Sequence, residues 1–187
     1  MNKKILVLNL LIFSVSANAA SEKQMINDSK LAIKRYSSIL KHTLKREMNK
    51  GSASNAVAAC HSGTDEINKQ LTAQSGWKIA RTALKYRNPE NAPDEWEKKV
   101  LLKFEKSKLN GATVKQLQHS EIIKQGDHSV FRFMQAIPMS GKCLSCHGDK
   151  LSTSVKAKLK QLYPQDNATG FKVGDIRGAF SITRKIR

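Results

Sequence analysis

The sequence predicts an α+β domain built on an antiparallel sheet, because helical patterns dominate its first half and strand patterns its second half. Apolar residues recur at helical spacing over residues 21–49, which predicts a long N-terminal helix. Two runs rich in β-forming residues, 118–124 and 129–136, are separated by Gly126-Asp127, a pair typical of hairpin turns. Strands joined by such a turn are neighbours in the sheet and run antiparallel.

The segment between the long helix and the hairpin predicts two short helices and a strand. Ser52 is suited to cap a helix that ends at Gly63, and residues 64–74 predict a second short helix. Residues 77–86 have the length and partial alternation of a strand. Pro89 follows shortly afterwards, and proline cannot continue a strand ladder.

Three further elements complete the predicted domain. Residues 93–110 predict a helix with acidic side chains in its first turn and lysines in its later turns, an order that suits the helix dipole. Trp96 and Phe104 lie on its expected buried face. A last helix is expected at residues 152–162 and a final strand at 178–183.

Residues 1–19 have the pattern of a signal peptide. Two lysines precede an apolar run at residues 5–15, and Ala17-Asn18-Ala19 is a typical cleavage site. A permanent membrane anchor is the alternative, but the apolar run is too short to span a bilayer. We therefore expect removal of residues 1–19, a single periplasmic domain over 20–187, and no membrane insertion after cleavage.

Cys143-Leu144-Ser145-Cys146-His147 is the sequence that attaches c-type haem. Two thiols three residues apart can each form a thioether with a haem vinyl group. The histidine that follows them can bring an imidazole nitrogen to the iron. We therefore predict one covalent haem, held by Cys143 and Cys146, with His147 as an iron ligand.

Two other chemistries are compatible with these cysteines. A thioredoxin-like dithiol uses a Cys-x-x-Cys pair in a βαβ setting, which the surrounding sequence does not predict. A zinc ion could be held by Cys60, Cys143, Cys146 and His147. Adjacent residues such as Cys146 and His147 seldom reach the same metal ion, so the haem interpretation is favoured.

The second axial position on the iron has several candidates in the sequence. Cys60 is the third cysteine of an exported chain, and it shares a predicted helix face with small apolar residues. A buried structural cysteine is the alternative interpretation. The other candidates, which are all histidines or methionines, are His61, His119, His128, Met134 and Met139.

The net charge of +18 becomes +16 when Lys3 and Lys4 leave with the signal peptide (18 − 2 = 16). So basic a chain raises nucleic acid as a partner, but export argues against it. Acidic redox or signalling proteins, anionic lipid head groups and the carboxylates of the haem fit better.

Four stretches together resemble a family of single-haem c-type proteins with a PAS-like fold. They are the haem motif through Gly148, the alanine-rich helix ending in Cys60, residues 81–97 with Arg-Asn-Pro-Glu-Asn-Ala-Pro-Asp-Glu-Trp-Glu, and residues 174–181. Members occur alone in the periplasm or as sensory domains of bacterial receptors. One departure is Ala83, where members often carry serine.

The resemblance implies a PAS-like antiparallel sheet flanked by helices, and it implies His147 and Cys60 as the axial ligands. Arg81 and Arg87 are candidate partners for the haem propionates, because guanidinium pairs bidentately with carboxylate. A surface or structural role is the alternative for both arginines.

Three functions are compatible with such a protein. A redox or diatomic-gas sensor module is the first, because a thiolate ligand can leave the iron and open a site for a gas. A soluble electron-transfer cytochrome is the second, with the basic surface docking an acidic partner. An enzyme such as a peroxidase or nitrogen-oxide reductase is the third, and would need an acid/base residue, for which His128 is the candidate.

Overall fold

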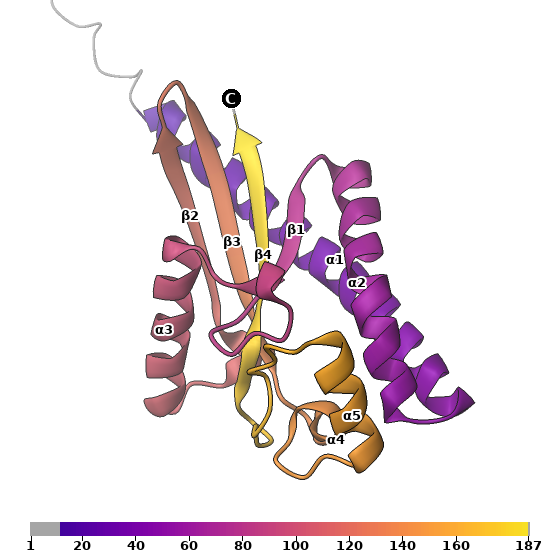
Figure 1. Ribbon diagram of the computed structural model, residues 1–187. Helices are drawn as coiled ribbons and strands as arrows, with labels where there is room; N and C mark the ends of the chain where they lie inside the picture. Colours follow the sequence, from indigo (N-terminus) through magenta and orange to yellow (C-terminus); the bar gives the residue numbers. More distant parts are fainter. Residues whose placement is uncertain (1–11, 187) are drawn as a thin grey trace, which may run out of the picture.

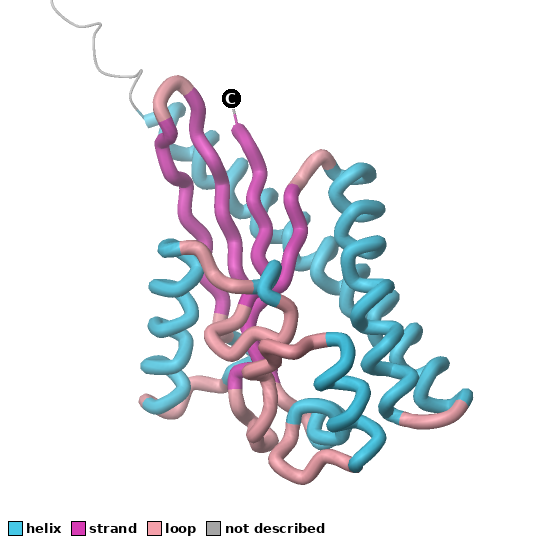
Figure 2. The backbone as a smooth tube through the Cα atoms, in the orientation of Figure 1, coloured by secondary structure: helices cyan, strands magenta, loops and turns pink. Residues whose placement is uncertain are grey.

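The computed structural model describes residues 12–186, and it shows an α+β fold with a four-stranded sheet in this part of the chain (Figures 1 and 2). The predicted fold class is therefore confirmed. In chain order the elements are α1 (Ile12–Lys50), α2 (Ala53–Ser75), β1 (Lys78–Thr82), η1 (Pro89–Asn91), α3 (Glu95–Leu109), η2 (Val114–Gln116), β2 (Gln118–Gln125), β3 (His128–Pro138), η3 (Gly141–Cys143), α4 (Leu144–His147), α5 (Thr153–Leu162) and β4 (Ile176–Ile186).

The sheet has the order β1-β4-β3-β2, and every neighbouring pair is antiparallel. β2 and β3 form the predicted hairpin, whose turn includes Gly126 at a φ of +62°. β4 is the last strand of the chain, yet it lies inside the sheet between β1 and β3 (Figure 1).

Helices cover both faces of the sheet. Alternate residues of a strand point to opposite faces, and β3 and β4 use this to form two cores. One core joins the sheet to α1 and α2 and contains Ile33, Tyr36, Ile67, Leu71, Phe131, Phe133, Phe180 and Ile182. The other joins it to α3 and contains Val100, Leu101, Phe104, Met134, Ala136, Ile176 and Ala179.

Two predicted elements differ from the structure. Residues 53–75 form one continuous helix, so the two short helices expected on either side of Gly63 are wrong. The helix instead ends at Gly76, which adopts a left-handed φ of +70°. The first strand ends at Thr82, because the following segment turns away from the sheet towards η1.

The predicted helix over residues 93–110 is present as α3 and begins with a complete capping box. Asp94 accepts a hydrogen bond from the Glu97 amide, and the Glu97 side chain accepts one from the Asp94 amide. This explains why the helix starts directly after the proline-rich segment.

Of the predicted signal peptide, residues 1–11 lie outside the described residues. Helix α1 already begins at Ile12. Within residues 12–186, no helix has the length and apolar character needed to cross a bilayer.

Candidate cofactor site

The cysteine motif lies on a short helical segment directly after β3. η3 carries Cys143, and α4 carries Cys146 and His147. Gly148 ends α4, and its amide donates to the Leu144 carbonyl. A Cβ at Gly148 would lie 2.7 Å from that carbonyl oxygen, so the tight end of the motif requires glycine.

The imidazole of His147 is held by its backbone-facing nitrogen. His147 Nδ1 lies 2.8 Å from the carbonyl oxygen of Ala168, so Nδ1 carries the proton and Nε2 presents a lone pair. Burial and the charges of Arg177 and Arg87 lower the pKa of His147 well below its usual value. The ring is therefore neutral, which is the form that binds a metal.

Cys60 lies on the face of α2 that packs against the motif. Ala53 and Val57, seven and three residues before it, belong to one helix face and contact Cys146 in a small core. Burial raises the pKa of the Cys60 thiol, while the nearby charge of Arg81 lowers it and that of Cys146 raises it. Cys60 and the predicted haem motif thus lie close together in the folded chain, although Cys60 and Cys143 are 83 residues apart in the sequence.

Arg87 links the motif to the segment that contains Asp166 and Ala168 through hydrogen bonds. Its Nε donates to Asp166 across 3.1 Å, and its Nη2 donates to the carbonyls of Cys146 at 2.6 Å and Ala168 at 3.3 Å. The Arg87 side chain is 9% exposed, and so is that of Asp166. Arg87 therefore positions the backbone around His147 with most of its donors.

Arg81 and Arg177 have no carboxylate partner among the described residues. Arg177 donates from Nη1 to the Lys85 carbonyl at 3.1 Å, and its Nε lies 3.5 Å from His147 Nε2. Burial, together with the positive charges of Arg81 and Arg87, lowers the pKa of Arg177. Of these three guanidinium groups only Arg87 pairs with a carboxylate, that of Asp166, and the excess of positive charge favours anionic groups at the site.

Arg177 was not among the predicted site residues. It lies inside the Gly-Asp-Ile-Arg-Gly stretch that carried part of the family resemblance, and this was the available signal. Its position became evident only from the folded chain, because 30 residues separate it from His147.

The remaining candidate ligands lie elsewhere, apart from one methionine. His61 is exposed and packs against Tyr163, while His119 stacks on Trp96. His128 lies beside Asp127 at the β2–β3 turn, at the opposite end of the sheet from α4 (Figure 1). Met134 is fully buried in the core under α3, and Met139 is packed beside Cys143 and Leu144.

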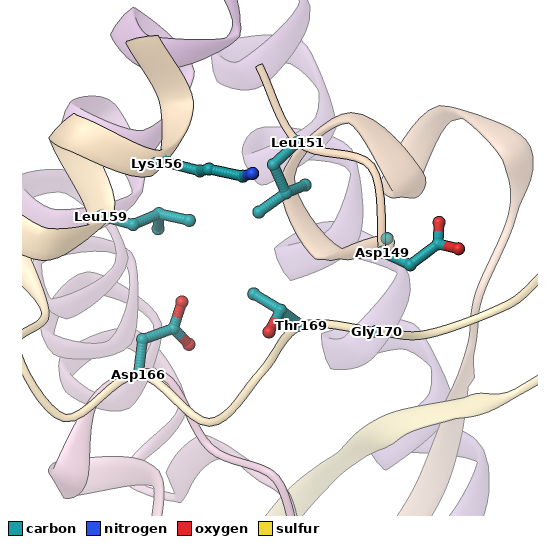
Figure 3. Close-up of a pocket in the computed structure, with 8 residues that line it drawn as sticks. Asp149, Leu151, Lys156, Leu159, Asp166, Thr169 and Gly170 are labelled. Carbon is teal, nitrogen blue, oxygen red and sulfur yellow. The ribbon is translucent and has the colours of Figure 1, made fainter. Parts of the chain in front are cut away.

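A cavity of about 360 Å³ adjoins the motif (Figure 3). It is bounded by α5 and the segments on either side of it, with Lys156 and Asp166 among its polar side chains. None of the four predicted haem residues lines this cavity. We place the candidate site where Cys60, the motif and the arginines converge, because three thiols and the imidazole of His147 lie close together there.

This donor set fits the haem predicted from the sequence better than it fits zinc. Two thiols, a further thiol, a neutral imidazole whose Nε2 has only a long contact from Arg177, and two guanidiniums without carboxylate partners in residues 12–186 match a dicarboxylate porphyrin. Within residues 12–186, no three histidine, cysteine, aspartate or glutamate side chains are grouped so that they could hold a metal ion. The zinc alternative therefore has no support from the geometry.

The fold and the site define an α+β protein in which a Cys-x-x-Cys-His segment packs against a helix that carries a third cysteine. A family model described as Tll0287 matches residues 14–184, and the chain therefore belongs to the Tll0287-like family. The crystal structure of the cyanobacterial haem-protein Tll0287 has a similar fold, with a TM-score of 0.64 and 24% identity. The match covers 86% of this chain and 94% of that one. Comparison with curated proteins found no match.

Proposed function

We propose that this chain is an exported protein that binds one c-type haem and serves as a redox or diatomic-gas sensor module. The observation that carries the proposal is the meeting of Cys60 with the Cys143–His147 motif, in a site with two guanidiniums that lack counter-ions. Membership of the Tll0287-like family, whose namesake is described as a haem-protein, supports the cofactor.

Each residue of the motif has a separate task in this proposal. Cys143 and Cys146 would hold haem through two thioethers, and His147 would bind iron through Nε2 while the Ala168 carbonyl fixes the ring through Nδ1. Cys60 would supply a second ligand to the iron. Haem bound in this way would supply an iron that can change its oxidation state and exchange an axial ligand.

Two of the arginines are proposed to bind the cofactor, and the third binds groups of the protein. Arg81 and Arg177 are available for the two haem carboxylates, because neither pairs with an acid of the described chain. Arg87 was also predicted as a propionate partner, but its bonds to Asp166, Cys146 and Ala168 favour the structural alternative. We propose that Arg87 acts on haem through the position of His147.

The sensor role depends on Cys60 as the ligand that leaves. Its thiol is attached to α2 and not to the motif, so its release would open the iron without detaching His147. The sensory role, the PAS-like architecture and the periplasmic location rest on the resemblance and the signal peptide predicted from the sequence. The signal itself would pass to a separate protein partner.

A soluble electron-transfer cytochrome is the second candidate, and the charge of the chain favours it. Lysine and arginine number 33 against 15 acidic residues, which suits docking to an acidic redox partner. In this case Cys60 would stay on the iron in both oxidation states.

The deciding experiment is electron paramagnetic resonance of the oxidised protein, purified from a host that matures c-type haem. We expect haem that stays attached on a denaturing gel, together with a low-spin thiolate signal. A bis-histidine or histidine–methionine signal would remove Cys60 and favour the electron carrier. Correctly matured protein without iron would refute the proposal.

Reduction of the same sample distinguishes a sensor from an electron carrier. Carbon monoxide is a suitable probe because it binds ferrous haem only where an axial position is free. If the protein is a sensor, we expect its reduced form to bind carbon monoxide rapidly. If it is an electron carrier, its six-coordinate spectrum should stay the same when carbon monoxide is added.

A further inference from the structure

The carboxylate of Asp166 binds the chain segment that faces the imidazole of His147. Asp166 lies between α5 and β4, and its Oδ1 accepts a hydrogen bond of 2.8 Å from the Ala168 amide (Figure 3). An aspartate that accepts from the amide two residues further on forms an Asx-turn, which bends the backbone locally. The carbonyl of Ala168, directly after this bend, is the acceptor for His147 Nδ1 at 2.8 Å.

Arg87 connects the same carboxylate to the backbone on both sides of the imidazole. Asp166 Oδ2 accepts from Arg87 Nε at 3.1 Å. Arg87 Nη2 donates to the carbonyl oxygens of Ala168 and Cys146, at 3.3 and 2.6 Å. Because His147 directly follows Cys146, a displacement of Asp166 alters both the acceptor of the imidazole and the backbone that carries the imidazole.

Burial makes these bonds hard to replace. The side chains of Asp166 and Arg87 are each 9% exposed, and Ala168 is fully buried. Water therefore has little access to the groups that a substitution would free. The Phe171 amide also binds this segment to the His147 carbonyl, at 3.0 Å and without the Asp166 side chain. The segment can thus stay in place while the direction of the Ala168 peptide changes.

We propose that Asp166 is a positioning residue for the iron ligand His147, and that it acts through the Ala168 peptide. Asp166 fixes the direction of the hydrogen bond that Nδ1 donates, and thereby the electron donation from Nε2. A hydrogen bond at the second nitrogen of a metal-binding imidazole makes that imidazole a stronger donor. Stronger donation favours ferric iron and lowers the reduction potential. The inference rests on the proposed function and adds Asp166 to it.

The test uses Asp166→Glu in the haem-loaded protein. This variant keeps the negative charge, but the longer side chain does not form an Asx-turn. We expect the spread of the low-spin g values to change in paramagnetic resonance, because this spread depends on the direction and basicity of the axial imidazole. We also expect the midpoint reduction potential to rise, while the haem content on a denaturing gel stays at the wild-type level.

A second variant keeps the inference testable if Asp166→Glu is poorly produced. Asp166→Asn has the same size as the wild type and keeps an acceptor for the Ala168 amide, but it loses the ion pair with Arg87. We expect its g values to move in the same direction as in Asp166→Glu and by a smaller amount. A change of charge alone would instead raise the potential and leave the g values unchanged.

Asp94→Glu is the matched control. The Asp94 carboxylate has the same kinds of partner as that of Asp166, namely one amide, that of Glu97, and one guanidinium, that of Arg132. Asp94 precedes α3 as its N-cap, in a different part of the fold from the motif. The control should leave the g values and the potential as in the wild type.

The failures can be told apart. Wild-type g values and potential in Asp166→Glu, with haem attached, would overturn the inference and leave the proposed function standing, even if the variant were less stable. A raised potential with unchanged g values would overturn it in favour of an effect of charge. Wild-type protein without covalent haem would overturn both.

Discussion

In the proposed function, replacement of the single side chain of Cys60 would separate haem attachment from haem ligation. Cys60→Ser keeps the size of the side chain but removes the thiol, whereas the thioethers proposed at Cys143 and Cys146 would be untouched. We expect covalent haem at wild-type content and loss of the low-spin thiolate signal, measured by a haem-stained denaturing gel and by paramagnetic resonance.

Ser62→Ala is the matched control for that variant, because Ser62 is exposed on the same helix. It should leave both the gel and the spectrum as in the wild type. A thiolate signal that persists in Cys60→Ser would show that another residue holds the sixth position, and Met139 would then be the next to replace.

Arg87 contributes to stability through a buried ion pair. Its removal in Arg87→Ala leaves Asp166 unpaired at 9% exposure and frees the carbonyls of Cys146 and Ala168. We expect the free energy of unfolding to fall by about 3 kcal/mol, as is typical when one partner of a buried pair is removed. Urea denaturation followed by circular dichroism measures this change.

The exposed pair of Arg46 and Glu47 provides the comparison for Arg87. Its N–O distance of 2.9 Å is similar to the 3.1 Å between Arg87 and Asp166, but the Arg46 side chain is 53% exposed. Arg46→Ala should leave the unfolding midpoint unchanged, because solvent screens surface pairs. Equal effects of the two substitutions would contradict the structural role assigned to Arg87.

The residues of the site differ in how far the sequence alone could predict them. The haem motif is contiguous, so its spacing could be interpreted directly. Arg177 could not be assigned in this way, because its significance depends on the contact between β4 and the motif. A guanidinium without a carboxylate partner is a property of the folded chain and has no local signature.

At the scale of whole elements, substitution of two glycines, one inside α2 and one at its C-terminal cap, is expected to have opposite effects on stability. Gly63 lies mid-helix, and a Cβ built there has no atom within 4 Å. Gly76 ends the helix at a φ of +70°, where an L side chain is strained. We expect Gly63→Ala to stabilise the protein by up to about 1 kcal/mol and Gly76→Ala to destabilise it by a similar amount, measured by thermal unfolding.

The pair of variants tests whether α2 is one helix in solution. If the helix broke at Gly63, as the local sequence predicts, alanine there would give no stabilisation. Equal signs for the two glycines would contradict the structure.

The elements were predicted where local chemistry determines them. The α3 capping box and the Gly126 turn are local signals, and both elements were predicted correctly. The continuity of α2 was missed because Gly63 favours a break locally, while packing of Val57, Ile67 and Leu71 against the rest of the fold extends the helix through it. The early end of β1 was missed for a similar reason, since the tertiary path of the chain decides it.

For the molecule as a whole, two acidic groups connect stability to pH. A hydrogen bond from Lys108, 2.7 Å away, lowers the pKa of Asp175. Burial raises the pKa of Asp94, but the hydrogen bond and charge of Arg132 and the hydrogen bonds from the Glu97 and Trp96 amides together lower it more, so the net pKa is lowered. The unfolded chain therefore binds protons at these groups at a higher pH than the folded chain does.

The resulting stability is complete above about pH 4, the pKa of an unfolded aspartate, and is lost as the pH falls through the lowered folded values. We expect the free energy of unfolding to decrease on acidification below about pH 4, and to decrease less in Asp175→Asn. Urea denaturation over a pH series measures this. Asp149→Asn, at an exposed position, is the control and should not alter the pH dependence. A wild-type curve that is flat through this range would contradict the assignment.

The position of β4 also determines the order in which the molecule can assemble. Among the described strands β1 pairs with β4 alone, and β4 is the last of these strands to be synthesised. The helix hairpin and the β2–β3 hairpin consist of neighbouring segments and can form early, but the sheet cannot close until the final strand inserts between its partners. Arg177 enters the site with that strand. The side of the site that holds Arg177 is therefore completed after the cysteine motif and α2 have been made.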